Sequence, residues 1–315
     1  MKQFFRITAA VLAAAFLLAL TGCGSSASAD TGDDGKVKIQ YWHINSENQG
    51  GAAVQEFIDE FNASQDKIEV EGRFNSTYDE LLKNLQADTA AGNTPSIVQV
   101  SWSNIEYFPD NFSYISPEDV ISKYFPEDKD FLTDTFDESI LNLARNSEGV
   151  LAGVPYSVSN PVLFYNADLL REAGLSEDGP KSWDEFVSFA KTVKEKTGKY
   201  GAYLQESDTW VLQAVLESGG ASMLTRDGDT ATATFNSEKG KAAMQSYADM
   251  VLKDQSAVHL TNMDDGLKAF NDGEVAMCIC SIAKATNIIN SANFDVRSTT
   301  FPTFDGEERA VPAGG

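Results

Sequence analysis

The sequence predicts an α/β protein, because short stretches with the alternating pattern of strands are followed by longer stretches with helical periodicity. Residues 36–43 alternate apolar and polar side chains, and residues 51–64 then place Val54, Phe57 and Ile58 on one face of a helix. The alternation continues over about 280 residues, which is long enough for two lobes with a core each. No segment of roughly 20 to 50 residues recurs, so the chain is not a solenoid.

The first half of the chain predicts a parallel sheet. Residues 67–74 form the second expected strand, and 96–102 form a short, mostly apolar third strand. Between them, Thr77 and Glu80 have the spacing of a capping box at the start of a helix over 78–92. This strand and helix order favours right-handed crossovers between parallel strands.

The second half repeats the alternation with different elements. We expect strands at 162–166, 200–205 and 274–280, and helices at 167–174, 183–198, 209–220 and 237–254. Ser182 and Glu185 have the spacing of a second capping box. Cys278 and Cys280 lie at i and i+2 on the last strand, a spacing that disfavours a disulfide, so we expect two small buried thiols.

The N-terminus predicts export. Two basic residues precede an apolar run at 7–20 that is too short for a comfortable membrane span and is typical of a signal peptide over 1–22. The letters LTGC at 20–23 resemble a bacterial lipobox, so we expect a lipid anchor on Cys23; a plain cleavable signal with an incidental cysteine is the alternative. Residues 23–36 are predicted to be a flexible tether.

Charge and motifs restrict the function. A formal net charge of -23 argues against nucleic acid and against lying on anionic lipid, so membrane contact is expected at the anchor alone. The nucleophile elbow, the phosphate loop, the two-histidine zinc motif and Cys-x-x-Cys are all missing, so we expect no enzyme, no metal and no cofactor. A carboxylate pair of a glycan hydrolase stays open as the enzymatic alternative.

Several sequence pieces carry a family resemblance. They read VPYSVSNPVLFYNADLLREAG (154–174), PKSWDEFVSFAKTV (180–193), AFNDGEVAM (269–277), FPTFDG (301–306) and VPAGG (311–315). In this order and spacing they resemble extracellular solute-binding proteins, family 1, of ABC transporters, which include maltose and glycerol-phosphate binding proteins. The resemblance extends over nearly everything from Lys36 onward.

The resemblance implies a two-lobed, periplasmic-binding-protein-like fold of type II, each lobe a mainly parallel sheet flanked by helices. It implies an N-lobe at 37–155, to which 301–315 return, and a C-lobe at 156–300. The chain would cross between lobes at 156–160 and again at 301–304. Family members continue beyond the Gly-Gly pair, so we expect this sequence to be incomplete at its C-terminus.

Ligands of open α/β sheets bind beyond the carboxyl ends of the strands, so the loops there hold the candidate binding residues. Sugar rings present apolar faces and a rim of hydroxyls, which suit aromatic platforms beside hydroxyl, amide and carboxylate groups. The candidates are Trp42, His43, Asn45, Glu47, Tyr78, Trp102, Asn104, Tyr156, Ser159, Asp208, Trp210 and Ser281. We expect Trp102 and Trp210 to stack on the solute from opposite lobes.

Some aromatic candidates have a structural alternative. Trp42 ends a strand, where a core position and a cleft position suit it equally. Tyr78 faces the cleft by resemblance, but stapling the first turn of its helix suits it nearly as well. His43 is expected to be a hydrogen-bonding wall residue rather than a catalytic base. Trp183 follows a capping serine, so we expect it to pack in the core and leave it out of the site.

The solute class is a choice between a neutral sugar and a phosphate ester. Phosphate recognition requires a cation or free helix N-terminal amides, and no basic cluster falls in the candidate loops. Trp102 stands where glycerol-phosphate members align an acidic residue, which favours a carbohydrate over glycerol 3-phosphate or its diesters. The letters SIAK at 281–284 replace an aromatic of maltose-type members, which argues against maltodextrin.

The expected partners follow from these points. We expect a monomer, lipid-anchored on the outer face of the cell membrane, that captures a small-molecule carbohydrate and delivers it to the permease subunits of an ABC importer. An adhesin or a ligand carrier for a chemoreceptor would share the same fold and anchor.

Overall fold

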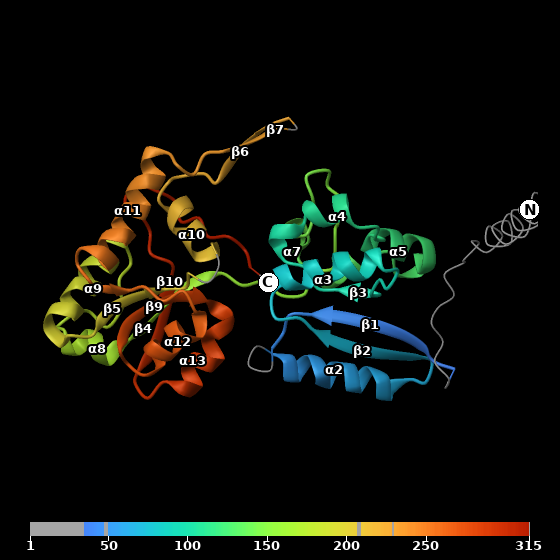
Figure 1. The fold of residues 1–315 in the computed structure, drawn as a ribbon, viewed down its shortest axis with the longest axis horizontal. Coiled ribbons are helices and arrows are strands. Elements are labelled where there is room, and N and C mark those ends of the chain that lie inside the picture. The colour runs from blue at the N-terminus through green and yellow to red at the C-terminus, as the bar shows by residue number, and fades with distance from the viewer. Residues whose placement is uncertain (1–34, 47–49, 207–208, 229, 315) are drawn as a thin grey trace, which may run out of the picture. The chain divides into compact units, whose positions relative to one another are not determined.

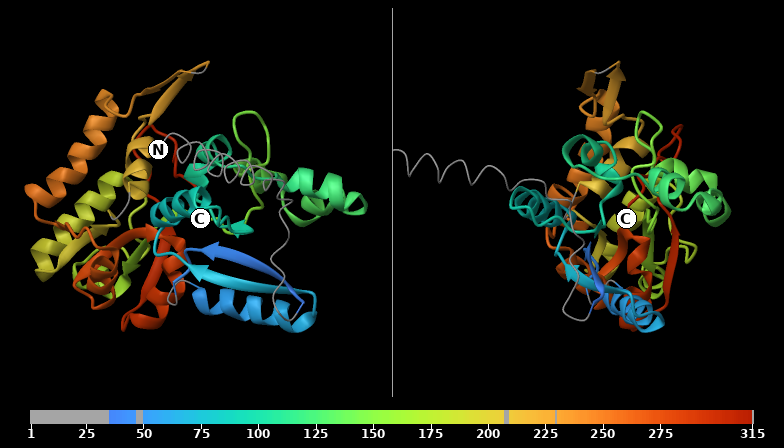
Figure 2. Two further views of the ribbon diagram at one scale, coloured as in Figure 1. Left: turned by 45° about the vertical axis from the view of Figure 1, so that its right-hand side comes forward. Right: turned by 90° about the vertical axis from the view of Figure 1, so that its right-hand side faces the viewer.

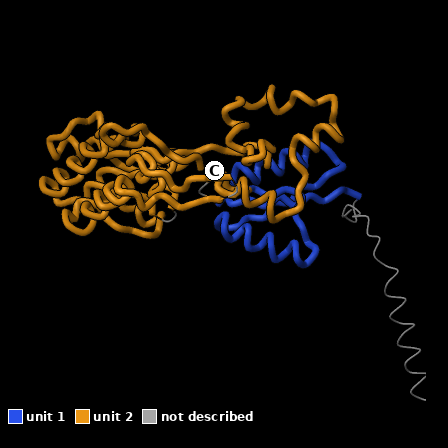
Figure 3. The backbone as a smooth tube through the Cα atoms, turned by 90° about the horizontal axis from the view of Figure 1, so that it is seen from above, with its two compact units in different colours: residues 1–99 blue, residues 100–315 orange. Residues whose placement is uncertain are grey.

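The computed structural model describes residues 35–46, 50–206, 209–228 and 230–314. They divide into two compact units, of which one ends at Gln99 and the other begins at Val100 (Figure 3). The lobe boundaries expected at 155 and 300 stay a prediction.

The first unit contains a parallel three-stranded sheet. In the order β2–β1–β3, its strands are β2 (Ile68–Phe74), β1 (Val37–His43) and β3 (Ile97–Val98). The first two strands confirm the predictions at 36–43 and 67–74. The third strand, β3, pairs over two residues only and is therefore shorter than the strand predicted over 96–102. Beyond Val98, Gln99 N donates one further hydrogen bond to Trp42 O, and the pairing with β1 then ends.

Helix α2 (Gly51–Ser64) packs against β2 and buries Val54 and Ile58 (Figure 2). Gly72 permits this close approach, because a Cβ there would lie 2.8 Å from Ile58 Cδ1. Helix α3 (Tyr78–Ala90) begins at Thr77, whose hydroxyl accepts from Glu80 N at 3.1 Å. Only half of the expected capping box is formed, because the Glu80 carboxylate accepts from the Ser76 hydroxyl instead.

Residues 100–153 open the second unit with short helices that the sequence analysis did not predict. They are η2 (Trp102–Asn104), α4 (Tyr107–Asn111), α5 (Pro117–Tyr124), η3 (Pro126–Asp128), α6 (Phe131–Thr135) and α7 (Glu138–Leu143). Ser116 caps α5 with its hydroxyl, and Pro117 at the first helical position suits the helix start. A small core of Leu132, Leu141 and Leu151 holds this segment together.

The main sheet of the second unit has five strands in the order β10–β4–β9–β5–β8 (Figure 1). They are β10 (Val296–Thr300), β4 (Pro161–Asn166), β9 (Val275–Ser281), β5 (Tyr200–Leu204) and β8 (Ala257–Val258). β5 runs parallel to both neighbours, and β4 runs antiparallel to both of its own. The sheet is therefore mixed, with its parallel part at β9, β5 and β8.

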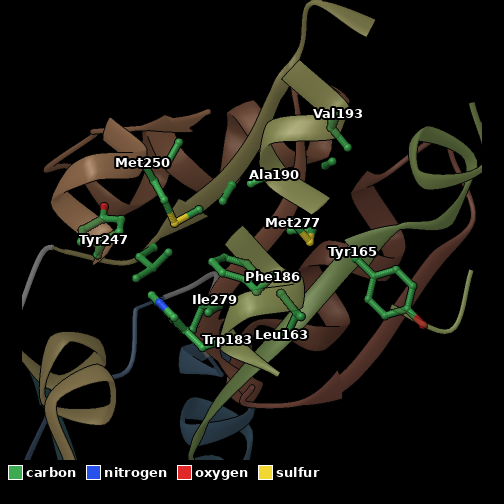
Figure 4. Packing of buried hydrophobic residues seen from close by; sticks show 14 of the residues in the cluster. Leu163, Tyr165, Trp183, Phe186, Ala190, Val193, Tyr247, Met250, Met277 and Ile279 are labelled. Atoms are coloured by element: carbon green, nitrogen blue, oxygen red, sulfur yellow. The ribbon is translucent and has the colours of Figure 1, made fainter. Parts of the chain in front are cut away.

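Helices cover both faces of this sheet. They are α8 (Ala167–Glu172), α9 (Trp183–Thr197), α10 (Trp210–Ser218), α11 (Glu238–Leu252), α12 (Met263–Asn271) and, after η4 (Ile282–Lys284), α13 (Ala285–Ser291). Met277 and Ile279 of β9 join the core with α8 to α11 (Figure 4). Cys278 and Cys280 face the core with α12 and α13, where both thiols are free and buried, as predicted.

Trp183 is a core residue, as expected from its place after a capping serine. Both halves of the Ser182 and Glu185 capping box are present. The indole is 2% exposed, stacks on Phe304 at 4.9 Å between ring centroids, and donates from Nε1 to Ser246 Oγ at 2.8 Å. The segment 301–304, expected as a crossing, therefore packs on α9.

A two-stranded hairpin of β6 (Leu224–Asp227) and β7 (Thr230–Ala233) projects from the second unit beyond α10 and α11 (Figure 2). All of its strand side chains are exposed. The Asp-Gly pair at 227–228 lies at its tip.

Candidate functional site

Gln99 organises the carboxyl end of the first sheet. Its side chain is buried, its Oε1 accepts from Ile44 N at 3.2 Å, and its Nε2 donates to the Tyr78 hydroxyl at 3.2 Å. Gln99 thus connects the ends of β1 and β3 to the first turn of α3. Asn45 follows Ile44 in the same loop, so the candidates Asn45 and Tyr78 belong to one neighbourhood, while Glu47 lies outside the described residues.

Trp42 has no exposed surface. Its indole Nε1 donates to Gln40 Oε1 at 3.2 Å, and the Arg73 guanidinium lies 4.0 Å from the ring centroid. These contacts favour the core alternative for Trp42, because a stacking platform must offer a free ring face.

His43 is 7% exposed and lies among Tyr41, Phe74 and Ile58 of the first unit. Burial lowers the pKa of His43 below its ordinary value of 6.5, so the neutral imidazole is favoured. Its Nδ1 is enclosed and has no hydrogen-bond partner among the described residues. The role of His43 as a hydrogen-bonding wall residue of the site stays a prediction.

Ser159 and Trp210 come together in the second unit through Gly314. Ser159 and Gly314 exchange backbone hydrogen bonds of 2.6 and 2.8 Å, and Trp210 Nε1 donates to Ala313 O at 3.2 Å. A Cβ at Gly314 would lie 2.6 Å from Trp210 Cζ2 and 2.8 Å from Ser159 Oγ, so only glycine fits against both. Trp210 is the first residue of α10 and is half-buried.

The segment 310–314 is held along this surface at further points. Ser218 Oγ, at the end of α10, donates to Ala310 O at 2.8 Å and accepts from Ala310 N at 3.1 Å. Asn160 Nδ2 donates to Pro312 O at 3.3 Å. The polypeptide at 159–160 and at 310–314 therefore lies side by side against α10.

Trp102 and Asn104 lie in the part of the second unit that the short helices of residues 100–153 form. Trp102 packs against the core of Leu132 and Leu141, and its Nε1 donates to Ser157 O at 3.0 Å. Asn104 ends the same short helix, and its backbone N–H donates to Ser101 O. Tyr156, one residue before Ser157, is 53% exposed.

Ser281 ends β9, pairs with Pro161 of β4 and caps η4 by accepting from Ala283 N at 3.2 Å. The Ser281 hydroxyl therefore stabilises the start of η4, and it also lies at the carboxyl end of β9. Asp208, expected in the neighbouring loop, lies outside the described residues.

The sequence analysis missed a charged cluster at the ends of β5 and β8. The Glu206 carboxylate, whose side chain is 9% exposed, accepts from the Tyr247 hydroxyl and lies 2.5 Å from His259 Nδ1. Burial and Glu206 together raise the pKa of Tyr247, so its hydroxyl stays protonated. The signal was present in the sequence, since Glu206 directly follows the strand at 200–205.

Lys284, two residues beyond the expected site residue Ser281, was also missed. It ends η4 directly after β9 and is 8% exposed. Among the described residues, it is the only buried lysine or arginine.

The described residues contain no group of three or more His, Cys, Asp and Glu side chains that could hold a metal ion. Over the same residues, every helix is too short or too polar to cross a membrane.

Comparison with known proteins decides the family. A profile described as bacterial extracellular solute-binding protein matches residues 45–315. The chain belongs to this family. It is a family of binding proteins rather than enzymes, which confirms the resemblance and the expectation that the chain is not a hydrolase.

Two curated relatives carry the name sn-glycerol-3-phosphate-binding periplasmic protein UgpB. That of Pectobacterium atrosepticum is 25% identical over 312 residues, covering 95% of this chain and 66% of the relative. That of Escherichia coli K12 is 25% identical over 292 residues, covering 87% and 63%. The chain thus spans just under two thirds of the length of these relatives.

Solved structures confirm the expected fold. The GacH receptor of Streptomyces glaucescens, solved unliganded and with acarbose, matches with a TM-score of 0.74 at 20% identity, covering 88% of this chain and 69% of that one. UgpB of Mycobacterium tuberculosis with glycerophosphocholine matches with a TM-score of 0.76 at 22% identity, covering 88% and 70%. Both support the α/β periplasmic-binding-protein fold.

Proposed function

We propose that the chain captures a carbohydrate or polyol-derived solute outside the cytoplasm and presents it to the permease of an ABC importer. The family match over residues 45–315 carries this proposal. The ligands for which similar proteins are named or with which they were solved, glycerol 3-phosphate for UgpB and acarbose for GacH, both carry hydroxyl groups. The polar and aromatic groups at the carboxyl ends of both sheets suit such solutes.

The candidate residues at the carboxyl ends of the two sheets would bind the solute. In the second unit we assign stacking to the Trp210 indole and hydrogen bonding to Ser159 and Ser281; in the first unit we assign hydrogen bonding to Asn45 and Tyr78. Contact with both lobes would stabilise a closed form over an open one, and the closed form would be recognised by the permease.

Glycerol 3-phosphate or a glycerophosphodiester is the second candidate solute. It is supported by the name of the curated relatives and by the glycerophosphocholine complex of the Mycobacterium tuberculosis protein. The two candidates differ in charge, so a titration that compares neutral and acidic solutes separates them.

Attachment to the membrane would come from Cys23. Two acyl chains on one cysteine hold a protein on a bilayer, whereas one chain binds reversibly. Replacing Cys23 with Ala is expected to release the protein into the soluble fraction, which fractionation and mass spectrometry of the mature N-terminus would detect. An unmodified Cys23 in the wild type would contradict the anchor.

The test of solute binding is calorimetric titration of the purified chain with neutral sugars, glycerol 3-phosphate and its diesters. Trp210→Ala is expected to abolish binding, because the stacking face is lost. The matched control is Ser218→Ala, which removes the side-chain bonds to Ala310 but keeps the indole. Equal losses in both variants would mean that the segment 310–314, and not stacking, controls binding; unchanged affinity in Trp210→Ala would refute the assignment.

A further inference from the structure

The carboxylate of Glu206 is held from two sides. Its Oε1 accepts from the Tyr247 hydroxyl of α11, and its Oε2 lies 2.5 Å from Nδ1 of His259, which directly follows β8. The Tyr247 hydroxyl stays protonated, because burial and the neighbouring carboxylate raise its pKa. Since the Glu206 side chain is only 9% exposed, these two contacts fix its position and that of the His259 ring.

The other side of the His259 ring is open to the outside. Its side chain is 58% exposed, although Nδ1 faces the enclosed Glu206 carboxylate. The exposed surface therefore belongs to the rest of the ring, which carries Nε2. In a neutral imidazole whose Nδ1 donates to a carboxylate, Nε2 is a hydrogen-bond acceptor. The pair thus presents an oriented acceptor, with a carboxylate behind the ring.

Glu206 and His259 lie at the edge of the sheet where solutes of open α/β sheets bind. β5 runs parallel to both β8 and β9, so the carboxyl ends of these three strands share one edge. Leu204 pairs with Ile279 in the register of β5 and β9. Glu206 and the candidate Ser281 each follow two residues beyond this pair, and so leave the sheet at the same level.

Glu206 also lies on the face of the sheet that α10 covers. Leu204 belongs to the core that β5 forms with α9, α10 and α11, and residues two apart on a strand share a face. Tyr247, which contacts Glu206, projects from α11 into the same core (Figure 4). Trp210, to which we assign stacking on the solute, packs against this core as well.

We propose that Glu206 and His259 form a solute subsite, in which Nε2 of the neutral His259 ring accepts a hydrogen bond from a solute hydroxyl and the carboxylate behind it disfavours phosphate and carboxylate groups. This inference rests on the proposed binding function and narrows its solute class to neutral polyhydroxylated compounds. An acceptor nitrogen has no proton to donate to an anion, and like charges brought together at an interface repel. Glu206 is then the positioning residue of the subsite.

Nitrogen NMR of the wild type tests the acceptor directly. At about pH 8, where an ordinary histidine is neutral, we expect the proton of His259 on Nδ1 and none on Nε2. The chain has two histidines, so the signals that disappear in His259→Gln identify this ring. Protonation of Nε2, alone or together with Nδ1, would overturn the inference. This result requires no folded variant of Glu206.

Calorimetric titration with matched pairs tests the selectivity: glucose with glucose 6-phosphate, galactose with galacturonate, and glycerol with glycerol 3-phosphate. We expect the wild type to bind the neutral member of at least one pair about tenfold more tightly than its acidic partner. Glu206→Gln keeps the shape and removes the charge, so this ratio should fall toward one. The matched control is Glu274→Gln at the amino end of β9, where the carboxylate pairs with Lys199 at the surface; it should keep the ratio.

The subsite and the proposed function fail in different ways. Neutral compounds that bind with the same ratio in wild type and Glu206→Gln would refute the subsite and leave the binding function intact. A wild type that prefers the acidic members would refute the subsite and favour the second candidate solute. Binding of no member of any pair would refute the proposed function, and the inference with it.

Discussion

The carboxyl ends of the two sheets use different chemistry. In the first unit, neutral groups bind one another: Gln99 links Ile44 to Tyr78, and Asn84 donates to Asn75. In the second unit, a buried carboxylate, Glu206, accepts a hydrogen bond from Tyr247 and lies 2.5 Å from His259 Nδ1. The first end is a framework whose buried amide side chains hydrogen-bond within the unit, whereas the second holds a buried carboxylate beyond the ends of β5 and β8.

The largest stability effect expected from this contrast comes from Tyr247→Phe. The variant removes a donor to the enclosed Glu206 carboxylate, and hydrogen bonds to charged groups contribute about 1.5–3 kcal/mol. Urea unfolding followed by circular dichroism would measure the loss. Tyr200→Phe is the matched control, since this ring lies at the surface under Lys194; equal changes in both variants would show that Glu206 gains nothing from Tyr247.

The elements of the second unit were largely predictable because their signals are local. Both residues of the capping box that starts α9 can be read from the sequence, and the structure forms both bonds. The helical patterns of α10 and α11 were equally clear. Residues 105–150 were not predicted, because each of their short helices buries at most one side chain and so shows no periodic buried face.

The candidate site was less predictable than the fold, because the residues that hydrogen-bond to one another there are far apart in the sequence. Glu206 and Tyr247 are 41 positions apart, and Gln99 and Tyr78 are 21 apart, so neither bond leaves a local pattern. Lys284 was overlooked because a single lysine in SIAK is indistinguishable from a solvated one until its burial is known. Trp42, in turn, could be placed in core or cleft until the structure showed it without exposed surface.

A smaller loss of stability is expected at the carboxyl end of the first sheet, where the hydrogen-bonding side chains are neutral. Gln99→Met keeps the volume but leaves Ile44 N and the Tyr78 hydroxyl without this partner, and two neutral hydrogen bonds contribute about 1–2 kcal/mol in total. Gln55→Met on α2 is the control, because its bond to Asp59 lies at the surface. Urea unfolding should separate the two variants. If Gln99→Met were no more destabilising than Gln55→Met, the two hydrogen bonds of Gln99 would contribute nothing to stability.

The smallest expected effect is a dependence of the free energy of unfolding on pH, caused by the titration of His43. Because burial lowers the folded-state pKa of His43 below 6.5, the unfolded state binds the proton more readily, so stability falls as pH drops through about 6.5 and levels off below the folded pKa. His43→Gln should flatten the stability profile between about pH 7 and pH 5. Both proteins should be compared with His259 replaced by Gln, since the chain has only two histidines and His43 is then the only one titrating. Parallel profiles would show that His43 is solvated, and the first unit's sheet end would be more open to water than its burial indicates.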